Sequence, residues 1–361
     1  MDQLSLWGGN PLQGQVAVSG AKNAALPIMA AALAIPGETR LERIPHLRDI
    51  VSMQGILEHL GMRVNWSGPH SLAIEHGSQD AFRVDYELMR TIRAGVCVLG
   101  PLLARRKQAC VSLPGGCNIG HRPIDLHLQG LAALGAEIRI EHGYVWASAG
   151  QLRGADIDLT GPRGSSVTGT CNVMTAACLA LGRTVLRGAA LEPEVVDLGN
   201  FLNRAGARIQ GLGTSELLID GVKELQSVEY EIIPDRIEAA TWMIAAAATR
   251  GSLELLNVQP EHLKFVIELL QRAGVNVSSA SNRIAVHCPQ ELAPVSVVAE
   301  PYPGFPTDVQ AQWAALMTTV QGQSEVRDRV FPDRFIYAAE LMRMGARIEK
   351  IPDGIRIQGV E

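Results

Sequence analysis

The stretch Leu134-Gly135-Ala136-Glu137-Ile138 joins an amphipathic helix pattern to a run of alternating apolar and polar residues, and it decides the fold because it recurs. Leu, Ala or Met followed by Gly, two variable residues and then Val or Ile occurs five times, 68 to 74 residues apart. The five glycines are Gly61, Gly135, Gly206, Gly274 and Gly345. A nearly constant period of this kind predicts a chain built from structural repeats.

Each recurring glycine predicts the end of a helix and the start of a hairpin. The segments before it, such as Leu198–Ala205 and His262–Ala273, carry apolar residues at helical spacing, and glycine is common just past a helix end. After it come two alternating runs separated by a turn, such as Glu137–Ile140 and Tyr144–Ala149, which predict a β-hairpin.

A helix and a strand precede this part of each repeat. The helix is rich in alanine, as in Ala239–Thr249, and the strand is expected to end in a proline. The five prolines are Pro45, Pro114, Pro193, Pro260 and Pro332. The predicted repeat is helix, strand, helix, strand, strand, which implies an α/β fold with parallel pairs beside each hairpin and helices on a sheet face. The alternative is an ordinary α/β protein whose spacing is coincidental.

Composition limits the function classes. The chain has 361 residues, enough for two or three domains, and a net charge of -5, which argues against a nucleic-acid or membrane-surface binder. The longest apolar stretch, Ala24–Ile35, is too short to span a bilayer and contains Pro27. The N-terminus has no basic segment, so we expect no export signal. The six cysteines lack metal-ligand spacing, so we expect a reduced, cytoplasmic protein without disulfides or zinc.

The second repeat contains an insertion. The step from proline to the following aspartate is four residues in the first and third repeats but eleven in the second, from Pro114 to Asp125. Insertions in one repeat map to a loop on one face, which is often the functional face. The pair Gly115-Gly116 predicts that this loop is mobile, as a lid would be.

Cys117 is the candidate reactive group of this loop. It lies five residues before Arg122, and a thiol near a guanidinium in a partly exposed loop has the setting that lowers a thiol pKa. The alternative is a free surface cysteine without a role. The other five cysteines occur in apolar helix or strand patterns and are interpreted as small core residues.

Three cations suggest an anionic ligand. Ser19–Asn23 opens the first alanine-rich helix, where backbone amides and Lys22 favour an anion; the alternative is a Ser N-cap with a solvated lysine. Arg93 lies among small and apolar residues, where it needs an anionic partner unless it sits at the edge of the apolar face. Together with Arg122 these groups suit a small phosphorylated acid. Acidic residues that open the equivalent later helices, such as Asp235 and Asp308, are normally only caps.

Five segments together resemble the enolpyruvyl transferase family, and the match runs along the whole chain. They are Ser19–Pro27 (SGAKNAALP), Ser112–His127 (SLPGGCNIGHRPIDLH), Pro234–Glu238 (PDRIE), Phe305–Gln312 (FPTDVQAQ) and Met344–Ala346 (MGA). The resemblance implies an inside-out α/β barrel of two domains, each made of three repeats, with the substrate cleft between them. We expect one domain over 22–231 and the other over 1–21 together with 232–361.

The resemblance also implies a reaction. Phosphoenolpyruvate would donate its enolpyruvyl group to a hydroxyl of a second substrate, with release of phosphate and without a metal or organic cofactor. Within the family, the Pro-Gly-Gly-Cys loop is similar to that of the members that use the 3′-hydroxyl of UDP-N-acetylglucosamine. The alternatives are a transferase that uses shikimate phosphate and a non-catalytic module that binds a nucleotide-sugar.

The residues that match the family's functional positions follow from the same resemblance. Cys117 would be the proton donor and Asp308 the base near the 3′-hydroxyl, and the two would meet only when the cleft closes. The expected phosphoenolpyruvate contacts are Lys22, Asn23, Arg93 and Arg122. The expected nucleotide-sugar contacts are Arg93, Arg122, Pro123, Ile124, Asp125, Leu126, Ser166, Val167, Asp308 and Val330.

The repeat count differs from the one that the resemblance implies. Five repeats are present, whereas two domains of three would need a sixth. Three interpretations are open: a shortened active enzyme, a chain completed by another chain through exposed apolar faces, or a non-catalytic paralogue. The intact candidate residues in the first five repeats favour the first interpretation.

Overall fold

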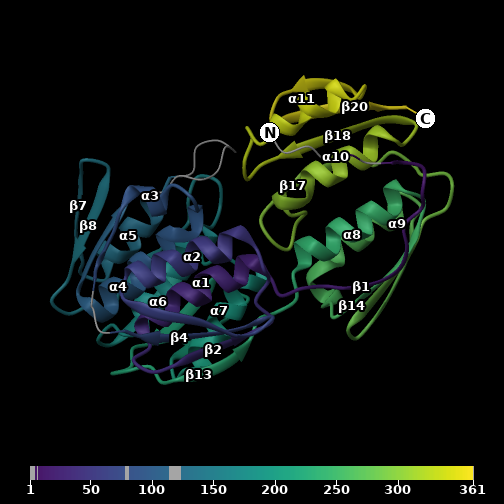
Figure 1. The fold of residues 1–361 in the computed structure, drawn as a ribbon. Coiled ribbons are helices and arrows are strands. Elements are labelled where there is room, and N and C mark those ends of the chain that lie inside the picture. The colour runs from purple at the N-terminus through teal and green to yellow at the C-terminus, as the bar shows by residue number, and fades with distance from the viewer. Residues whose placement is uncertain (1–4, 6, 78–80, 114–122, 361) are drawn as a thin grey trace. The chain divides into compact units, whose positions relative to one another are not determined.

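The computed structural model describes residue 5 and residues 7–77, 81–113 and 123–360. The chain divides into two compact units (Figure 1). The larger unit is Gly20–Ile233, and the smaller unit is Met1–Ser19 together with Pro234–Glu361. Each unit has its own hydrophobic core.

The larger unit contains three repeats. The first comprises α1 (Lys22–Ala31), η1 (Ala32–Ala34), β2 (Thr39–Glu42), α2 (Arg48–His59), β3 (Met62–Gly68) and β4 (Ser71–His76). The second comprises β5 (Arg83–Val84), α3 (Tyr86–Met89), η2 (Arg93–Val98), α4 (Leu99–Arg106), β6 (Gln108–Ser112), α5 (Asp125–Ala133), β7 (Glu137–Glu141) and β8 (Tyr144–Ser148). The third comprises β9 (Asp156–Asp158), α6 (Val167–Ala177), β10 (Arg183–Arg187), α7 (Pro193–Arg204), β11 (Arg208–Gln210) and β12 (Glu216–Asp220), and β13 (Val228–Glu231) follows it.

The smaller unit contains two repeats. The fourth comprises β1 (Gln13–Ala17), α8 (Arg236–Ala248), β14 (Ser252–Leu256), η3 (Pro260–Leu263), α9 (Lys264–Arg272), β15 (Asn276–Ala280) and β16 (Arg283–His287). The fifth comprises β17 (Val297–Ala299), η4 (Thr307–Val309), α10 (Gln310–Thr318), β18 (Gly322–Asp328), α11 (Ile336–Arg343), β19 (Arg347–Ile351) and β20 (Gly354–Gly359).

Each repeat forms a small four-stranded sheet in which a parallel pair adjoins an antiparallel hairpin. In the third repeat, β10 pairs parallel with β9 and antiparallel with β12, which pairs with β11. The described residues contain five such sheets, so the predicted α/β class and parallel pairs are confirmed. Chain returns complete two of them, because β13 pairs with β2 and β1 pairs with β14.

Two details of the predicted repeat were wrong. It lacked the strand that lies before the first helix, because strands such as β5, with two residues, are too short to show an alternating pattern. The strands also end before their prolines rather than at them: β18 ends at Asp328, four residues before Pro332. In the third repeat, Pro193 is the first residue of α7 instead, a position that needs no backbone N–H.

The recurring glycines end helices, as predicted. Gly135 and Gly345 have φ angles of 96° and 100°, which lie in the left-handed region. The amide of the residue after each glycine reaches back over the helix end: Ala136 N–H donates to Leu131 O at 3.1 Å and Ala346 N–H to Leu341 O at 3.0 Å. This is the Schellman pattern, which turns the chain directly into the hairpin.

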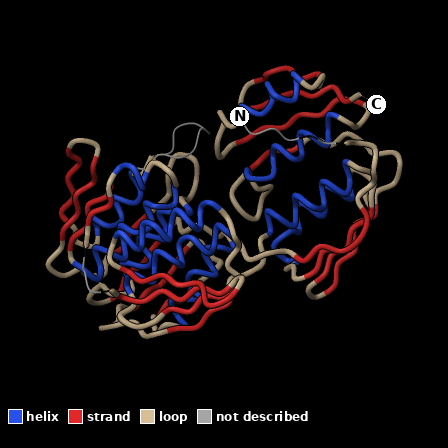
Figure 2. The backbone as a smooth tube through the Cα atoms, in the orientation of Figure 1, coloured by secondary structure: helices blue, strands red, loops and turns tan. Residues whose placement is uncertain are grey.

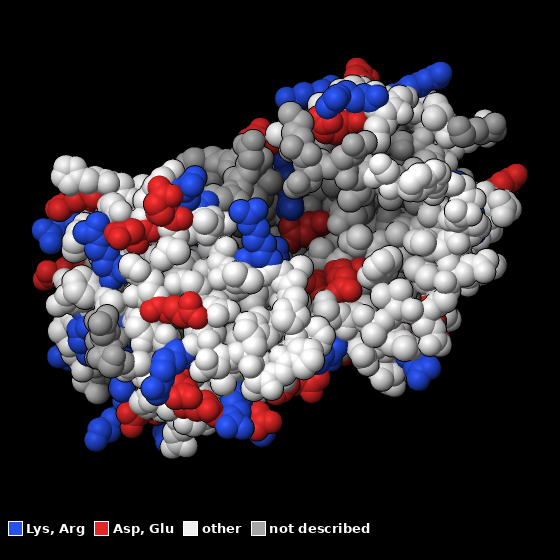
Figure 3. Space-filling model, in the orientation of Figure 1, with Lys and Arg blue, Asp and Glu red and all other residues white. Residues whose placement is uncertain are grey.

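The alanine-rich helices lie inside their units and the sheets lie outside them (Figure 2). In α1 every residue from Ala24 to Ala31 is buried. Small alanine side chains allow this central helix to pack against α2, α7 and η2 at once. On the face shown in Figure 3, basic and acidic side chains are interspersed. No helix of the described residues has the length and apolar character needed to cross a membrane.

Candidate active site

Asp308 lies at the start of the fifth repeat's first helix, but it does not cap that helix. No side chain caps η4, whose N-cap position is Pro306. Instead, Asp308 Oδ1 accepts a hydrogen bond of 2.6 Å from Arg334 Nη1. The two side chains are 37% and 22% exposed, so the ion pair is within reach of solvent. The interpretation of an acidic residue as a simple cap is therefore wrong for Asp308.

Asp235, at the equivalent place in the fourth repeat, does cap its helix. Asp235 Oδ1 accepts from Ile237 N at 2.8 Å and from Glu238 N at 3.0 Å. The two aspartates therefore differ in what their side chains hold. One satisfies amides of its own helix, and the other holds a cation from a segment that follows β18.

A buried carboxylate lies behind the Asp308–Arg334 pair. Asp328 is fully buried at the end of β18 and accepts hydrogen bonds from Thr307 Oγ1 and from Gln310 Nε2, the latter at 2.7 Å. It also accepts from Val330 N at 2.8 Å, so it fixes the backbone of a candidate nucleotide-sugar contact. Sequence reasoning gave Asp328, Thr307 and Arg334 no role.

A signal for Asp328 was present in the sequence. Along β18 the buried residues are Ser324, Val326 and Asp328, one face of an alternating strand. A carboxylate at an inward position of such a strand must be paired or hydrogen-bonded. The search for motifs missed it because the aspartate belongs to no recurring pattern.

Lys22 is the first residue of α1, and its ammonium lies 3.1 Å from Asp49 Oδ2 in the first turn of α2. The N-cap residue is Ala21, so no side chain caps this helix. Ser19 hydrogen-bonds elsewhere, since its hydroxyl donates to Glu238 Oε2. The alternative of a Ser N-cap with a solvated lysine is therefore wrong. Asn23 is the next residue of the same helix.

Arg93 is the first residue of η2, which packs against α1. Burial raises the pKa of the nearby Cys97 thiol to about 12, and the charge of Arg93 opposes that shift. Cys97, Cys110, Cys171, Cys178 and Cys288 are all buried, which confirms their interpretation as core residues. Cys117 and Arg122 lie outside the described residues.

Two of the predicted nucleotide-sugar segments meet in the larger unit. Pro123 and Ile124 lead into α5, whose first residues are Asp125 and Leu126. Ser166 is the N-cap of α6 and accepts from Gly169 N at 3.1 Å, and Val167 is the first residue of that helix. His127 Nε2 of α5 lies 3.0 Å from Thr168 Oγ1 of α6, so the first turns of these two helices lie side by side.

A buried amide and an imidazole hold these helices together. His127, 2% exposed, lies 3.0 Å from Thr168 Oγ1 through Nε2 and 2.8 Å from Asn172 Nδ2 through Nδ1. Asn172 Nδ2 also donates to Val96 O at 2.8 Å, and Asn172 Oδ1 accepts from Gly100 N at 2.7 Å. The network thereby ties η2 and α4 to both predicted segments.

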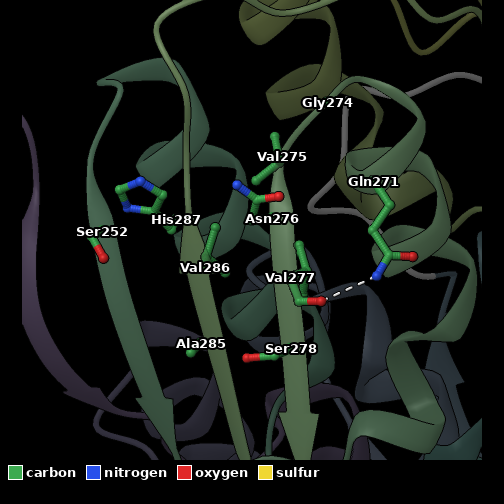
Figure 4. Close-up of a pocket in the computed structure, with 10 residues that line it drawn as sticks. All are labelled: Ser252, Gln271, Gly274, Val275, Asn276, Val277, Ser278, Ala285, Val286 and His287. Atoms are coloured by element: carbon green, nitrogen blue, oxygen red, sulfur yellow. Dashed lines mark hydrogen bonds between the residues drawn. The ribbon is translucent and has the colours of Figure 1, made fainter.

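A hollow in the described surface of the smaller unit lies away from the predicted site residues. It has a volume of about 490 Å³ between α9 and the hairpin of β15 and β16, and Gln271 Nε2 donates to Val277 O at 3.1 Å on its wall (Figure 4). None of its ten lining residues is acidic, lysine or arginine. It offers no charge for a phosphate and contains no predicted site residue.

Comparison with known proteins gives the family. The family model for EPSP synthase (3-phosphoshikimate 1-carboxyvinyltransferase) matches residues 6–361. The chain is 48% identical to UDP-N-acetylglucosamine 1-carboxyvinyltransferase of Desulfatibacillum aliphaticivorans, over 100% of this chain and 86% of that protein. It is also 48% identical to the protein of the same name from Methylacidiphilum infernorum, over 100% and 85%.

Solved structures show the same fold at lower identity. The enolpyruvyl transferase NikO from Streptomyces tendae superposes with a TM-score of 0.87 at 24% identity and covers 98% of this chain and 83% of its own. An EPSP synthase from Acinetobacter baumannii gives 0.68 at 19% identity, with the same coverage. The repeats, the small sheets and these likenesses lead to one conclusion: the chain belongs to the enolpyruvyl transferase family, the family of EPSP synthase.

Proposed function

We propose that this protein transfers the enolpyruvyl group of phosphoenolpyruvate to the 3′-hydroxyl of UDP-N-acetylglucosamine and releases phosphate. The observation that carries the proposal is the identity of 48% over the whole chain with a relative named for this activity. The reaction would be the first committed step of peptidoglycan synthesis, in the cytoplasm, and would support cell shape and division.

The reaction needs an acid and a base on opposite sides of the new bond. Protonation of C3 of phosphoenolpyruvate gives C2 oxocarbenium character, the sugar 3′-oxygen bonds to C2, and the base takes the hydroxyl proton. Loss of a C3 proton and of phosphate from the resulting tetrahedral intermediate then forms the enol ether. We assign the acid to Cys117, which lies outside the described residues, and the base to Asp308, whose carboxylate Arg334 holds at 2.6 Å.

We propose that the phosphate and carboxylate of phosphoenolpyruvate are bound by Lys22, Asn23, Arg93 and Arg122. Lys22 pairs with Asp49 across a distance of 3.1 Å, so a bound phosphate would compete with that carboxylate. Lysine suits this role because its ammonium can turn from one anion to another. The start of α1 adds the favourable dipole of a helix N-terminus.

We assign UDP-N-acetylglucosamine to the start of α5, the start of α6 and the turn after β18. The Ser166 hydroxyl already accepts from Gly169 N, and its own proton can be donated to a diphosphate oxygen. The assigned contacts are Arg93, Arg122, Pro123, Ile124, Asp125, Leu126, Ser166, Val167, Asp308 and Val330.

Phosphate release from phosphoenolpyruvate tests the proposal directly. The 361-residue chain is assayed alone, with UDP-N-acetylglucosamine and with shikimate 3-phosphate as the matched control acceptor. We expect release that depends on the nucleotide-sugar. Release only with shikimate 3-phosphate would assign the chain to the other activity of the family. Binding of the nucleotide-sugar without release would identify a non-catalytic binding protein.

Labelling by a thiol-reactive epoxide of the fosfomycin type tests Cys117. We expect a single adduct at Cys117, because the five described cysteines are buried and burial raises the pKa of their thiols. Cys117→Ser should abolish the adduct, detected by peptide mass spectrometry, and should leave nucleotide-sugar binding unchanged. An adduct on Cys97 or Cys110 would refute the assignment.

A further inference from the structure

Asp328 is a carboxylate that the fold keeps away from solvent. It is fully buried, and no ion pair joins it to a lysine or arginine within the described part of the chain. Its two oxygens instead accept four hydrogen bonds, two from side chains and two from backbone amides. Four acceptor positions are the full capacity of a carboxylate, so every one is used.

The four donors come from the two segments that meet at the candidate base. On one side, Thr307 Oγ1 and Gln310 Nε2 donate from the first residues of η4 and α10, which flank Asp308 in the sequence. On the other side, the amides of Val330 and Phe331 donate at 2.8 and 2.7 Å and fix the turn that leads to Arg334. One carboxylate therefore holds both partners of the Asp308–Arg334 pair.

Further hydrogen bonds extend this arrangement on both sides. Arg334 Nη1 lies 3.3 Å from Thr307 Oγ1, the hydroxyl that donates to Asp328. Tyr337 Oη donates to Gln310 Oε1 at 2.6 Å and so fixes the orientation of the amide whose nitrogen faces Asp328. Each side-chain polar atom of Asp328, Thr307 and Gln310 therefore has a hydrogen-bond partner, which favours a rigid local geometry.

A neutral side chain could not hold the same arrangement. An apolar residue would leave two backbone amides without acceptors, and asparagine would present an N–H group to the amide nitrogen of Gln310. A buried carboxylate is costly unless its hydrogen bonds are complete. The fold therefore keeps a costly group at this position for the four acceptors that it supplies.

We propose that Asp328 is a positioning residue that sets the geometry of the base Asp308 through Thr307 and of Arg334 through the turn at Val330. This inference rests on the proposed transferase activity. Asp328 touches neither substrate nor reacting atoms in this role. Loss of Asp328 should therefore lower the rate of the chemical step. It should leave the binding of phosphoenolpyruvate by Lys22 and Arg93 in the larger unit unchanged.

An exchange of the amide and the carboxylate across one hydrogen bond tests the proposal. In the wild-type protein Gln310 Nε2 lies 2.7 Å from Asp328 Oδ2. At this contact Asp328→Asn places two N–H donors face to face, and Gln310→Glu places two carboxylates face to face. Each single variant should lower kcat roughly 10- to 100-fold, the scale of a small misplacement of a catalytic group, with KM for phosphoenolpyruvate within a factor of about two. The double variant restores one amide and one carboxylate and should recover most of kcat.

A second pair of variants keeps the test valid if the buried exchange prevents folding. Thr307→Val removes one donor to Asp328 and leaves the other three, whereas Thr307→Ser keeps the hydroxyl. We expect kcat to fall about tenfold for Thr307→Val and to stay within about twofold for Thr307→Ser. All rates are normalised to the folded fraction, measured from urea unfolding curves.

The outcomes separate this proposal from the proposed function. A wild-type protein without nucleotide-sugar-dependent phosphate release would refute the function and, with it, a positioning role in that reaction. Wild-type release together with an unchanged kcat per folded molecule in the single variants would refute the positioning role alone. Failure of the double variant to exceed either single variant would also overturn it.

Discussion

Two buried polar networks, one in each compact unit, hold the segments that carry the candidate site, and they are built from different chemistry. In the larger unit the centre is the neutral amide of Asn172, bound to His127, Val96 and Gly100. In the smaller unit the centre is the carboxylate of Asp328. A neutral network suits segments that only need to be fixed, while the charged one lies beside Asp308, the residue proposed to take a proton.

The difference predicts different consequences of mutation. Asn172 ties together η2, α4, α5 and α6, and its own contacts carry no charge toward the substrates. Asp308 and Arg334 are partly exposed, and their ion pair joins the start of η4 to the segment after β18. Changes at the neutral network should therefore mainly lower stability, and changes at the charged pair should mainly lower the rate.

The largest effect is expected for Asp308→Asn. The amide can still accept from Arg334 but cannot take a proton, so kcat should fall about 10³-fold, within the range of a lost general base. The free energy of unfolding should change by about 1 kcal/mol or less, because the ion pair is partly exposed. Phosphate release and urea unfolding measure the two quantities.

The matched control is Asp235→Asn at the equivalent helix start, where the side chain caps α8. This variant should change kcat little and cost a few tenths of a kcal/mol to about 1 kcal/mol of stability. If Asp308→Asn kept turnover within tenfold of wild type, Asp308 would not be the base. If it unfolded the protein, the role of Asp308 would be structural.

The next largest effect is expected for Asn172→Ala. It leaves Gly100 N–H and Val96 C=O without their partner in a dry interior, and a buried unsatisfied group costs about 1–3 kcal/mol. We expect a loss of roughly 3–4 kcal/mol in the free energy of unfolding, measured by urea denaturation. Turnover per folded molecule should fall less than in Asp308→Asn.

Thr175→Val is the control on the same helix. Thr175 is as buried as His127, but its hydroxyl donates only to Cys171 O one turn earlier, so its removal should cost about 1 kcal/mol. Equal losses for Asn172→Ala and Thr175→Val would show that the network contributes no more than an ordinary local hydrogen bond.

The repetitive parts of the fold were predictable from sequence because they depend on local rules. Helix ends at Gly135 and Gly345 need a residue that tolerates positive φ, and the hairpins show alternation over four or more residues. The site segments were found through their resemblance to a family. Of these, Asp308, Lys22 and Arg93 carry charges on helix starts, where a pattern search looks first.

The supporting network was not predictable because it depends on long-range contacts between unlike elements. Asp328 meets Thr307 across 21 positions of sequence, and Asn172 meets Val96 across 76. Neither pair has a spacing rule, and a buried Asn or Asp looks like a surface residue in a single sequence. The completion of two sheets by β1 and β13 has the same cause, since these strand pairings are not local.

A pH-dependent effect is expected for Asp197, a buried carboxylate in the larger unit that sharpens the comparison with Asp328. It accepts from Tyr230 Oη at 2.6 Å and more weakly from Ile233 N at 3.3 Å, where Asp328 has four donors. Burial raises the pKa of Asp197 to about 6, against the hydrogen bonds, which lower it. The folded protein therefore binds this proton more tightly than the unfolded chain.

The sign of the pH dependence follows from that difference. The contribution of Asp197 to stability is fully present below about pH 4, falls as pH rises toward about 6 and is constant above it. A difference of this size corresponds to roughly 3 kcal/mol. Asp197→Asn removes the titration, so the wild-type free energy of unfolding minus that of the variant should decrease by that amount between pH 4 and 7.

Asp220→Asn provides the opposite sign. Its exposed carboxylate accepts from Arg183 at 2.7 Å, and this hydrogen bond holds the pKa of Asp220 below its usual value. The wild-type free energy of unfolding minus that of Asp220→Asn should therefore rise with pH. The rise should be slight because the ion pair is exposed. Urea unfolding at several pH values measures both variants. A pH-independent difference for Asp197→Asn would mean that two hydrogen bonds suffice to keep a buried carboxylate ionised. The four hydrogen bonds to Asp328 would then not be needed to keep its carboxylate charged, and their number would need another explanation.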